Sequence, residues 1–416
     1  MVRVRRKRGP GAHAAPAAPP RHGTRWVSTD NGGVTESPDV VVIGGGLIGL
    51  GIAWRASLLG LRVTVADPEP GRGASWAAAG MLAPVTEAHF GEEALIRLNV
   101  AAAARYPGFV EELEAETGME CGYRRCGTLA VGLDGDDVRA LDDLAVFQRS
   151  LGLEAVRLSG RQCRELEPLL APGIRGGLHV ASDHQVDNRR LVRALLAAVS
   201  RRAELVPERV TEVVVAAGHV SGVRLGGGTT LRAGAVVVAA GCWSADLPGM
   251  PASARPPVRP VKGHILRLRA PAQPPLIGRT VRWLARGVPG YLVPRLDGEL
   301  VLGATSEERG FDTEVRAGAV HELLRDAHEV IPGVGEACLA ECRVGLRPGS
   351  PDNAPILGPT EVGGLVLATG HHRNGVLLAP ITADTIGSLL AEGRTDPVIA
   401  PFGLARLSAS VGAAGG

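Results

Sequence analysis

The first run of residues with a regular secondary-structure pattern is apolar and β-branched. Residues 39–43 read Asp-Val-Val-Val-Ile, which is typical of a short parallel strand buried on both faces. A glycine run at 44–49 follows, and the Ala- and Leu-rich stretch 50–59 predicts a helix. Residues 61–66 return to the β-branched pattern and end at Asp67. The pattern therefore predicts a complete strand–helix–strand unit.

Similar apolar runs recur along the chain and predict further strands and helices. The expected strands lie at 128–132, 179–182, 235–240, 261–268, 291–294, 299–303 and 365–369. The expected helices lie at 92–117, 136–151, 188–203, 316–330 and 380–392. This order, with mixed strands in the middle and a strand–loop–helix at the end, favours a discontinuous nucleotide-binding domain with a β-rich insertion.

The glycine run has the spacing of a dinucleotide-binding turn. Gly44 allows the tight turn, Gly46 lets the backbone approach a pyrophosphate, and Gly49 lets the helix pack closely. The pyrophosphate would lie over free N–H groups at the start of the helix. Asp67 ends the next strand, where a carboxylate accepts hydrogen bonds from ribose hydroxyls and disfavours a 2′-phosphate. The motif predicts FAD or NAD and does not separate the two.

These elements define the expected fold class. It is α/β, a Rossmann-like dinucleotide-binding domain with an inserted, β-rich antiparallel substrate domain. The dinucleotide-binding domain is expected at 39–120, 180–250 and 335–405, and the substrate domain at 121–179 and 251–334. No internal repeat is visible.

Composition and charge narrow the class of protein. The 416 residues are 45% hydrophobic, enough for a sizeable core, and aromatic residues are 3%, which argues against base-stacking surfaces for nucleic acid. Residues 1–38 hold seven Lys and Arg against two acids, so this tail has a net charge of 7 − 2 = +5. The whole chain has a formal net charge of +2, so residues 39–416 have a net charge of 2 − 5 = −3. The tail is rich in Pro, Ala and Gly and is expected to be disordered. We favour a tail without a specific function, or a misassigned start codon, over a segment that binds nucleic acid or membranes.

Targeting and cysteine patterns point to the cytoplasm. The tail lacks an apolar signal core, and no run of roughly 18 apolar residues occurs, so neither a secretory signal nor a membrane span is expected. The cysteines lack zinc-ligand spacing and histidine partners, so we expect reduced thiols, with no metal and no disulfide. They are Cys121, Cys126, Cys163, Cys242, Cys338 and Cys342.

Longer stretches carry a resemblance. The sequence resembles the D-amino-acid oxidase family of FAD-dependent oxidoreductases, and within it the glycine oxidases of thiamine biosynthesis. The matching stretches span residue 39 to about residue 392 and read VVVIGGGLIGLGIAWRASLLGLRVTVAD, GASWAAAGML, VVVAAGCWS, PVKGHIL, YLVPR, ELVLGAT, GLRPGSPDNAPILG and ATGHHRNGVLLAP. The last two are the most specific.

The resemblance implies non-covalent FAD. Besides Gly44, Gly46 and Gly49, the implied contacts are Leu47, Ile48, Asp67, Pro68, Ala74, Ser75, Ala79, Gly80, Met81 and Val210. The stretch implied to face the isoalloxazine ring comprises His371, His372, Arg373, Asn374, Gly375, Val376 and Leu377. Related sarcosine oxidases attach FAD through a cysteine, and no cysteine follows Cys342 here.

The resemblance also implies a substrate site. Arg347 matches the arginine that binds the substrate carboxylate, a role suited to a planar guanidinium that stays charged. Tyr291 matches a pocket tyrosine that reaches the same carboxylate, and Arg373 an arginine near substrate and flavin. The chain departs from the pattern at Pro289 and Gly290, where a polar residue is sometimes found, which puts fine substrate preference in doubt.

The expected reaction is oxidative deamination of glycine to an imino acid or glyoxylate, with O2 reduced to H2O2. No catalytic acid or base is assigned, because the amine can lose its proton to water and His371 is expected to orient the flavin. The alternatives left open are a D-amino-acid or sarcosine oxidase, a quinone-linked dehydrogenase, and a non-catalytic dinucleotide sensor. A homo-oligomer is expected, since tetramers occur among glycine oxidases.

Overall fold

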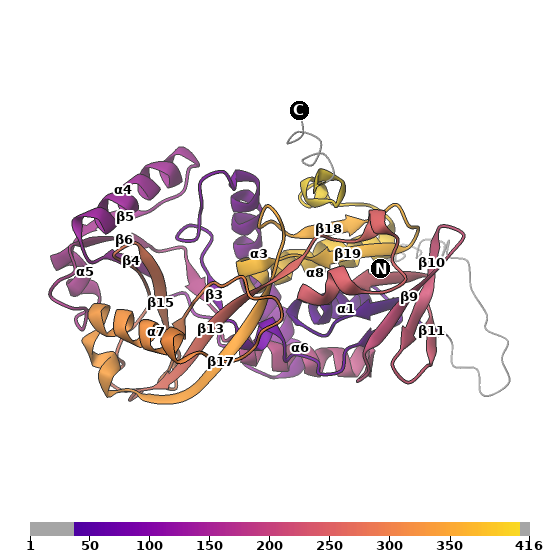
Figure 1. Cartoon of the computed structure of the whole chain (residues 1–416), viewed down its shortest axis with the longest axis horizontal. Coiled ribbons are helices and arrows are strands. Elements are labelled where there is room, and N and C mark those ends of the chain that lie inside the picture. The colour runs from indigo at the N-terminus through magenta and orange to yellow at the C-terminus, as the bar shows by residue number, and fades with distance from the viewer. Residues whose placement is uncertain (1–36, 408–416) are drawn as a thin grey trace, which may run out of the picture. The chain divides into compact units, whose positions relative to one another are not determined.

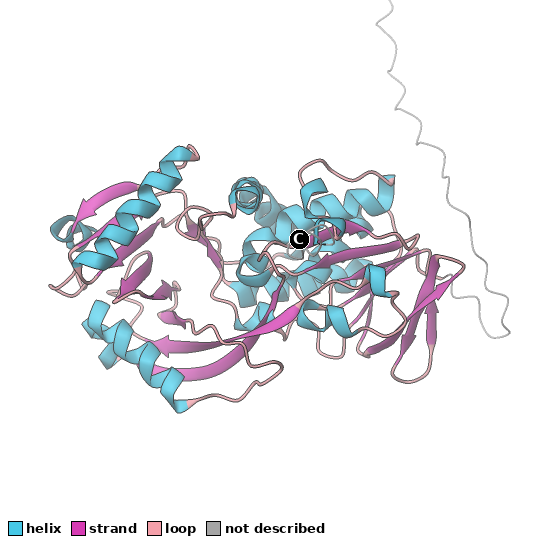
Figure 2. Cartoon of the chain, turned by 45° about the horizontal axis from the view of Figure 1, so that its top comes forward, coloured by secondary structure: helices cyan, strands magenta, loops and turns pink. Residues whose placement is uncertain are grey.

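Two large sheets organise residues 37–407, the part of the chain that the computed structural model describes (Figure 1). The expectation for the basic tail, residues 1–38, lies outside these residues except for the last two. Figure 2 shows both sheets with the helices that accompany them.

The first sheet contains the predicted strand–helix–strand unit. Its six strands lie in the order β18-β19-β12-β1-β2-β8, and all neighbours pair in parallel except β18 and β19. The strands are β1 (Val40–Ile43), β2 (Val63–Ala66), β8 (Glu204–Val206), β12 (Ala235–Val238), β18 (Ile356–Pro359) and β19 (Leu365–Thr369). The first expected unit is therefore confirmed in type and order.

Strand β1 is apolar throughout because both of its faces are covered. Val40 and Val42 pack into a core with helices, whereas Val41 and Ile43 pack into a second core with a three-stranded antiparallel sheet. The helices of the first core are α1 (Leu47–Leu58), α3 (Glu93–Thr117), α6 (Asn188–Arg202) and α8 (Gly375–Glu392). The small sheet, which the sequence did not predict, comprises β9 (Val210–Ala216), β10 (His219–Leu225) and β11 (Thr230–Arg232).

The second sheet has eight strands in the order β17-β13-β16-β15-β14-β4-β6-β5. Its neighbours pair antiparallel except β14 and β4, which pair in parallel, so the antiparallel expectation misses one pair. The strands are β4 (Thr128–Gly132), β5 (Val156–Ser159), β6 (Gly176–Val180), β13 (Arg259–Arg269), β14 (Thr280–Ala285), β15 (Val288–Pro294), β16 (Glu299–Gly303) and β17 (Cys338–Gly349). Helices α4 (Gly135–Ser150), α5 (Gly160–Leu166) and α7 (Ala317–Val330) pack against it.

Strand β17 lies in the eight-stranded sheet and not in the dinucleotide-binding domain, where it was expected. Residues 335–405 were assigned to the dinucleotide-binding domain, but β17 pairs with β13 along its length, from Gly349 opposite Arg259 to Cys338 opposite Arg269. The first half of β17 is exposed or partly exposed, and its apolar and charged residues do not alternate, so pairing across the sheet determines its structure. Figure 1 shows β13 and β17 running side by side.

Helix α8 begins earlier than expected, at Gly375 instead of residue 380, so Pro380 lies inside it. Proline has no N–H to donate, which leaves the carbonyl oxygen of Val376 without its usual helical partner. The buried hydroxyl of Tyr106 on α3 donates to that oxygen at 3.0 Å. Residues 372–392 are long and apolar enough to cross a membrane by length and composition, but 72% of the apolar 18-residue window within them is buried, as in a core helix.

Candidate active site

A cavity of about 1050 Å³ is lined by residues from both large sheets. Most of the expected cofactor residues line it: Gly44, Gly46, Leu47, Ile48, Asp67, Pro68, Ala74, Ser75, Ala79, Gly80, Met81, Val210, His371, His372, Arg373, Gly375 and Val376. Both expected carboxylate ligands, Arg347 and Tyr291, line it too. Three expected cofactor residues do not line the cavity, namely Gly49, Asn374 and Leu377.

The glycine turn joins β1 to α1 at one end of the cavity. Gly44 has a φ of +107°, a left-handed conformation that favours glycine. A Cβ at Gly49 would overlap the carbonyl oxygen of Gly44, so Gly49 packs the helix onto the turn and contacts no cavity. No side chain caps α1 at Gly46, and the Leu47 N–H donates to the Ser75 hydroxyl at 2.9 Å. A helix start that has no side chain at its N-cap residue fits a pyrophosphate.

Asp67 lies at the end of β2, at the same side of the cavity. Its Oδ2 accepts the N–H of Gly45 at 2.7 Å and its Oδ1 accepts the N–H of Glu69 at 2.8 Å. The two bonds hold the carboxylate beside the glycine turn, and Val210 and Pro68 also line the cavity. A fixed carboxylate beside such a turn fits a ribose.

The turn before α8 lines another part of the cavity. Nε2 of His371 lies 3.1 Å from the Thr382 hydroxyl, and the side chain is buried. Burial lowers the pKa of His371 and of His372 to about 3, with the nearby charge of Arg373 adding to the effect on His372. Both rings are therefore neutral near pH 7. Nδ1 of His372 is buried without a hydrogen-bond partner among the described residues, which fits an atom that bonds to a ligand.

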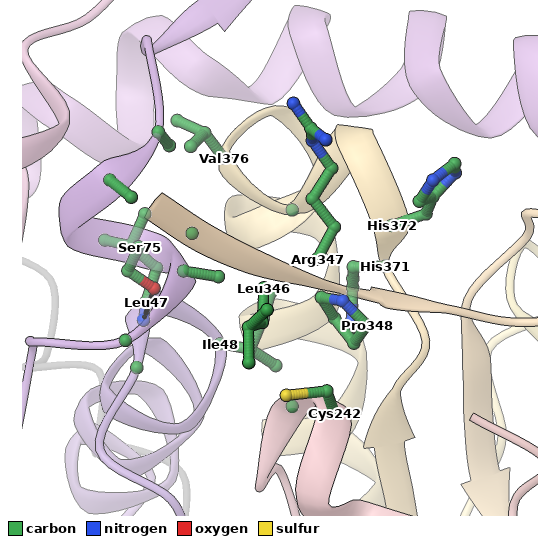
Figure 3. A pocket seen from close by; sticks show the side chains of 18 of the residues that line it. Leu47, Ile48, Ser75, Cys242, Leu346, Arg347, Pro348, His371, His372 and Val376 are labelled. Atoms are coloured by element: carbon green, nitrogen blue, oxygen red, sulfur yellow. Dashed lines mark hydrogen bonds between the residues drawn. The ribbon is translucent and has the colours of Figure 1, made fainter. Parts of the chain in front are cut away.

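Arg347 and Tyr291 come from the eight-stranded sheet. Arg347 lies on β17, and its guanidinium crosses Gly263 of β13 so closely that a Cβ there would be 2.5 Å from Nη1. Nη1 also donates to the carbonyl oxygen of Thr305 at 3.1 Å. Burial raises the pKa of Tyr291 to about 12, against the opposing effect of Arg347, so its phenol is neutral. Figure 3 shows the Arg347 side chain extending away from β17.

Strand register explains why these side chains meet. Directly paired residues on neighbouring antiparallel strands point to the same face. One such row crosses five strands of this sheet next to the cavity, and it comprises Arg282, Tyr291, Gly303, Ile265 and Arg343. All members except Gly303 line the cavity. Arg347 is opposite Val261, four residues along β17 from Arg343, so it lies outside this row but on the same face of the sheet. This end of the cavity is therefore built from side chains distant in sequence that strand pairing places on one face.

Carboxylates pair with the neighbouring arginines but not with Arg347. Arg282 contacts Glu87 at 2.7 Å, and Arg343 contacts Glu341 at 2.8 Å. Arg373, which was expected near the substrate, pairs with Glu92. Arg347 has no carboxylate partner within the described range 37–407. It is the arginine of this group that is open to an external anion.

Sequence reasoning missed several charged or titratable residues of the cavity, among them Glu87, His89 and Arg282. Glu87 and His89 lie on the segment 83–92, which has no helix or strand pattern, and Arg282 lies on the unpredicted strand β14. The available signal was a single charged residue within the largely apolar run of β14. Burial lowers the pKa of His89, and the neighbouring Arg373 adds to this effect.

Comparison with known proteins agrees with this geometry. Residues 39–389 match the model of the family described as FAD dependent oxidoreductase. The chain belongs to that family. Its cofactor is FAD, and the glycine turn, Asp67 and the turn before α8 fit this cofactor.

Individual members of the FAD-dependent oxidoreductase family are similar over most of the chain. Glycine oxidase of Geobacillus kaustophilus is 34% identical over 386 residues, covering 91% of this chain and 100% of the relative. The bifunctional protein ThiO/ThiG of Trichormus variabilis is 35% identical over 371 residues, covering 88% of this chain. The chain spans about half of that relative, 55% of its length. A crystal structure of the G. kaustophilus enzyme superposes with a TM-score of 0.80 at 33% identity, covering 88% of this chain and 98% of that one.

Proposed function

We propose that this enzyme is a glycine oxidase, which converts glycine and O2 to the imino acid and H2O2. The observation that carries the proposal is the unpaired guanidinium of Arg347, held over Gly263 in the cavity that the flavin residues line. A guanidinium binds a carboxylate through two parallel hydrogen bonds. The similarity to glycine oxidases supports glycine as the amino acid.

The protein's part in the reaction is mainly positioning. Arg347 holds the carboxylate, and the neutral Tyr291 phenol donates a hydrogen bond to it, so that the Cα–H bond is directed at the ring. The residues that hold FAD are those of the glycine turn, Asp67, Ser75 and the turn before α8. Bound FAD would supply the two-electron redox chemistry, with O2 as the final electron acceptor.

The reactive form of the amine is neutral, and water takes its proton. His371 and His372 do not serve as the base, because their pKa values of about 3 leave almost no capacity to hold a proton near pH 7. The imino acid then hydrolyses to glyoxylate and ammonia or is used by thiazole synthesis for thiamine, a role that the ThiO/ThiG similarity supports. We place the enzyme in the cytoplasm as a homo-oligomer.

Spectroscopy of the purified protein tests this function. We expect a yellow protein whose flavin absorbance bleaches with glycine without oxygen, returns in air and releases peroxide in proportion. A bleached state that persists in air would identify a dehydrogenase instead, and a protein that binds no flavin would overturn the proposal. Peroxide release from glycine, sarcosine and D-alanine ranks the substrates, and a clear preference for sarcosine or D-alanine would replace glycine in the proposal.

Substitution of Arg347 tests the carboxylate site. We expect Arg347→Ala to lower kcat/KM for glycine by roughly a hundredfold or more, since it removes a charge-assisted bidentate contact, and Arg347→Lys to recover part of the loss. Arg269→Ala, at the exposed end of β13, is the matched control for removal of an arginine from this sheet. An unchanged kcat/KM in Arg347→Ala would remove Arg347 from the site.

A further inference from the structure

A second arginine lines the substrate end of the cavity and is neutralised there. Nη1 of Arg282 lies 2.7 Å from Oε1 of Glu87 and 3.8 Å from the sulfur of Met81. The two charged side chains are largely buried, with 17% and 12% of their surfaces exposed. Both residues line the cavity that also contains Arg347.

The pair lies beside the proposed carboxylate position. Arg282 on β14 is directly opposite Tyr291 on β15, so the two side chains stand next to each other on the cavity face of the sheet. The Tyr291 phenol responds to both charges, because Glu87 raises its pKa and Arg282 lowers it. A substrate held by Tyr291 therefore lies within reach of the same two charges.

Glu87 is held in place by its own segment. The carboxylate of Asp183, which is fully buried, accepts the N–H of Val85 at 3.1 Å and the N–H of Thr86 at 2.7 Å, as well as the Thr86 hydroxyl. Gln148 donates to the carbonyl oxygen of Val85 at 2.8 Å. These bonds fix the backbone immediately before Glu87. The contact with Arg282 then holds its carboxylate in the cavity wall.

We propose that Glu87 is a specificity-determining residue that restricts the enzyme to amino acids with one carboxylate. The proposal rests on the proposed function for the position of the substrate. Glu87 neutralises Arg282, so Arg347 is the cation at the substrate end of the cavity that has no carboxylate partner within residues 37–407. A second substrate carboxylate would meet the like charge of Glu87. Without Glu87, Arg282 becomes an unpaired, partly buried guanidinium that would bind that second carboxylate.

Ligand binding by the holoenzyme tests this without turnover. Acetate and malonate differ by one carboxylate, and each is titrated against the bound-flavin absorbance of the wild type, Glu87→Gln, Arg282→Met and the double variant. We expect the malonate-to-acetate affinity ratio to rise at least tenfold in Glu87→Gln and to fall in Arg282→Met. The double variant should return near the wild-type ratio, because neither charge remains. Flavin content reports that each variant is folded.

Turnover gives a second readout. Iminodiacetate is sarcosine's counterpart with a carboxylate on the N-substituent, so the ratio of their kcat/KM values isolates the added charge. We expect this ratio to rise at least tenfold in Glu87→Gln and to revert in the double variant.

Two results would overturn the proposal. An unchanged malonate-to-acetate ratio in Glu87→Gln would remove Glu87 as the determinant, and an equal rise in the double variant would show that Arg282 does not bind the second carboxylate. A wild type that binds acetate but oxidises neither glycine nor sarcosine would instead contradict the proposed function. In that case the malonate comparison still decides the role of Glu87.

Discussion

The two ends of the cavity are built by different means. At the six-stranded sheet, the glycine turn and the start of α1 form the wall largely from backbone, within a few residues of one another. At the eight-stranded sheet, Arg347, Tyr291 and Arg282 come from three strands and form the wall with side chains. The cofactor end therefore depends on local chain geometry, and the substrate end on register between distant strands.

Because of this difference, the two ends of the cavity should respond differently to amino-acid substitutions. A backbone site tolerates many side chains provided that its glycines remain, because N–H groups bind the ligand. A site of side chains changes its specificity with one substitution, and the wall around Arg282 and Glu87 is an example. Substitutions at the two ends should therefore fail in different ways: loss of cofactor at one end, and loss of turnover with the cofactor retained at the other.

Gly49→Ala should have the largest effect, at the cofactor end. Its Cβ would overlap the carbonyl oxygen of Gly44, forcing α1 away from the turn. Overpacking of this kind costs about 3 kcal/mol, and we expect a destabilised protein purified with little flavin. The absorbance ratio of flavin to protein measures the loss. Gly51→Ala on the same helix is the control, because its Cβ would meet the Ala383 methyl group at 3.1 Å and the Ala379 carbonyl oxygen at 3.9 Å. Equal flavin loss in both variants would contradict the role given to Gly49.

Gly263→Ala should come next, at the substrate end. The added methyl group would occupy the space of the Arg347 guanidinium and displace it. Misplacement of about 1 Å in a positioning group costs roughly a hundredfold in rate, so we expect that loss in kcat/KM for glycine with full flavin content. Gly318→Ala on α7, whose Cβ would meet nothing within 4 Å, is the control. A Gly263→Ala enzyme with wild-type kcat/KM would show that Arg347 does not need this position.

The same contrast explains what the sequence could predict. The pattern of β1, the glycine turn and Asp67 lies in fewer than thirty consecutive residues, so local propensity and spacing were enough. Arg347 and Tyr291 were reached through family resemblance, because nothing local distinguishes them from other residues of a strand. Arg282 and Glu87 are 195 residues apart in sequence, and only the folded sheet brings them together.

Strand β17 and the small sheet β9–β11 were missed for a related reason. The residues of β17 and β9 alternate weakly between buried and exposed positions, and pairing with a neighbouring strand decides their structure. Strand β10 does alternate, but Gly222 interrupts its pattern. The early start of α8 was missed because Pro380 normally marks the first turn of a helix. Here a side chain from another helix compensates for the proline.

Tyr106→Phe measures that compensation, and the expected effect is smaller. The variant keeps the ring packing but leaves the carbonyl oxygen of Val376 buried without its donor. An unsatisfied buried acceptor costs about 1–3 kcal/mol, and we expect a loss of that size in the free energy of unfolding by urea. A loss in Tyr106→Phe that is matched by Tyr123→Phe, whose ring stacks on Tyr106 from a less buried position, would show that the bond to Val376 is not the cause.

The smallest expected effect concerns the pH dependence of kcat/KM. The titratable groups considered at both ends of the cavity are neutral near pH 7. Burial lowers the pKa of His371 and His372 to about 3 and raises that of Tyr291 to about 12, so all three stay neutral from about pH 5 to 10. The rise of kcat/KM for glycine with pH should then follow the substrate amine. His371→Asn, His372→Asn and Tyr291→Phe should change its height while its midpoint stays within about half a pH unit. A larger shift of the midpoint in one histidine variant would identify that ring as the base. The ring, and not water, would then take the proton from the amine.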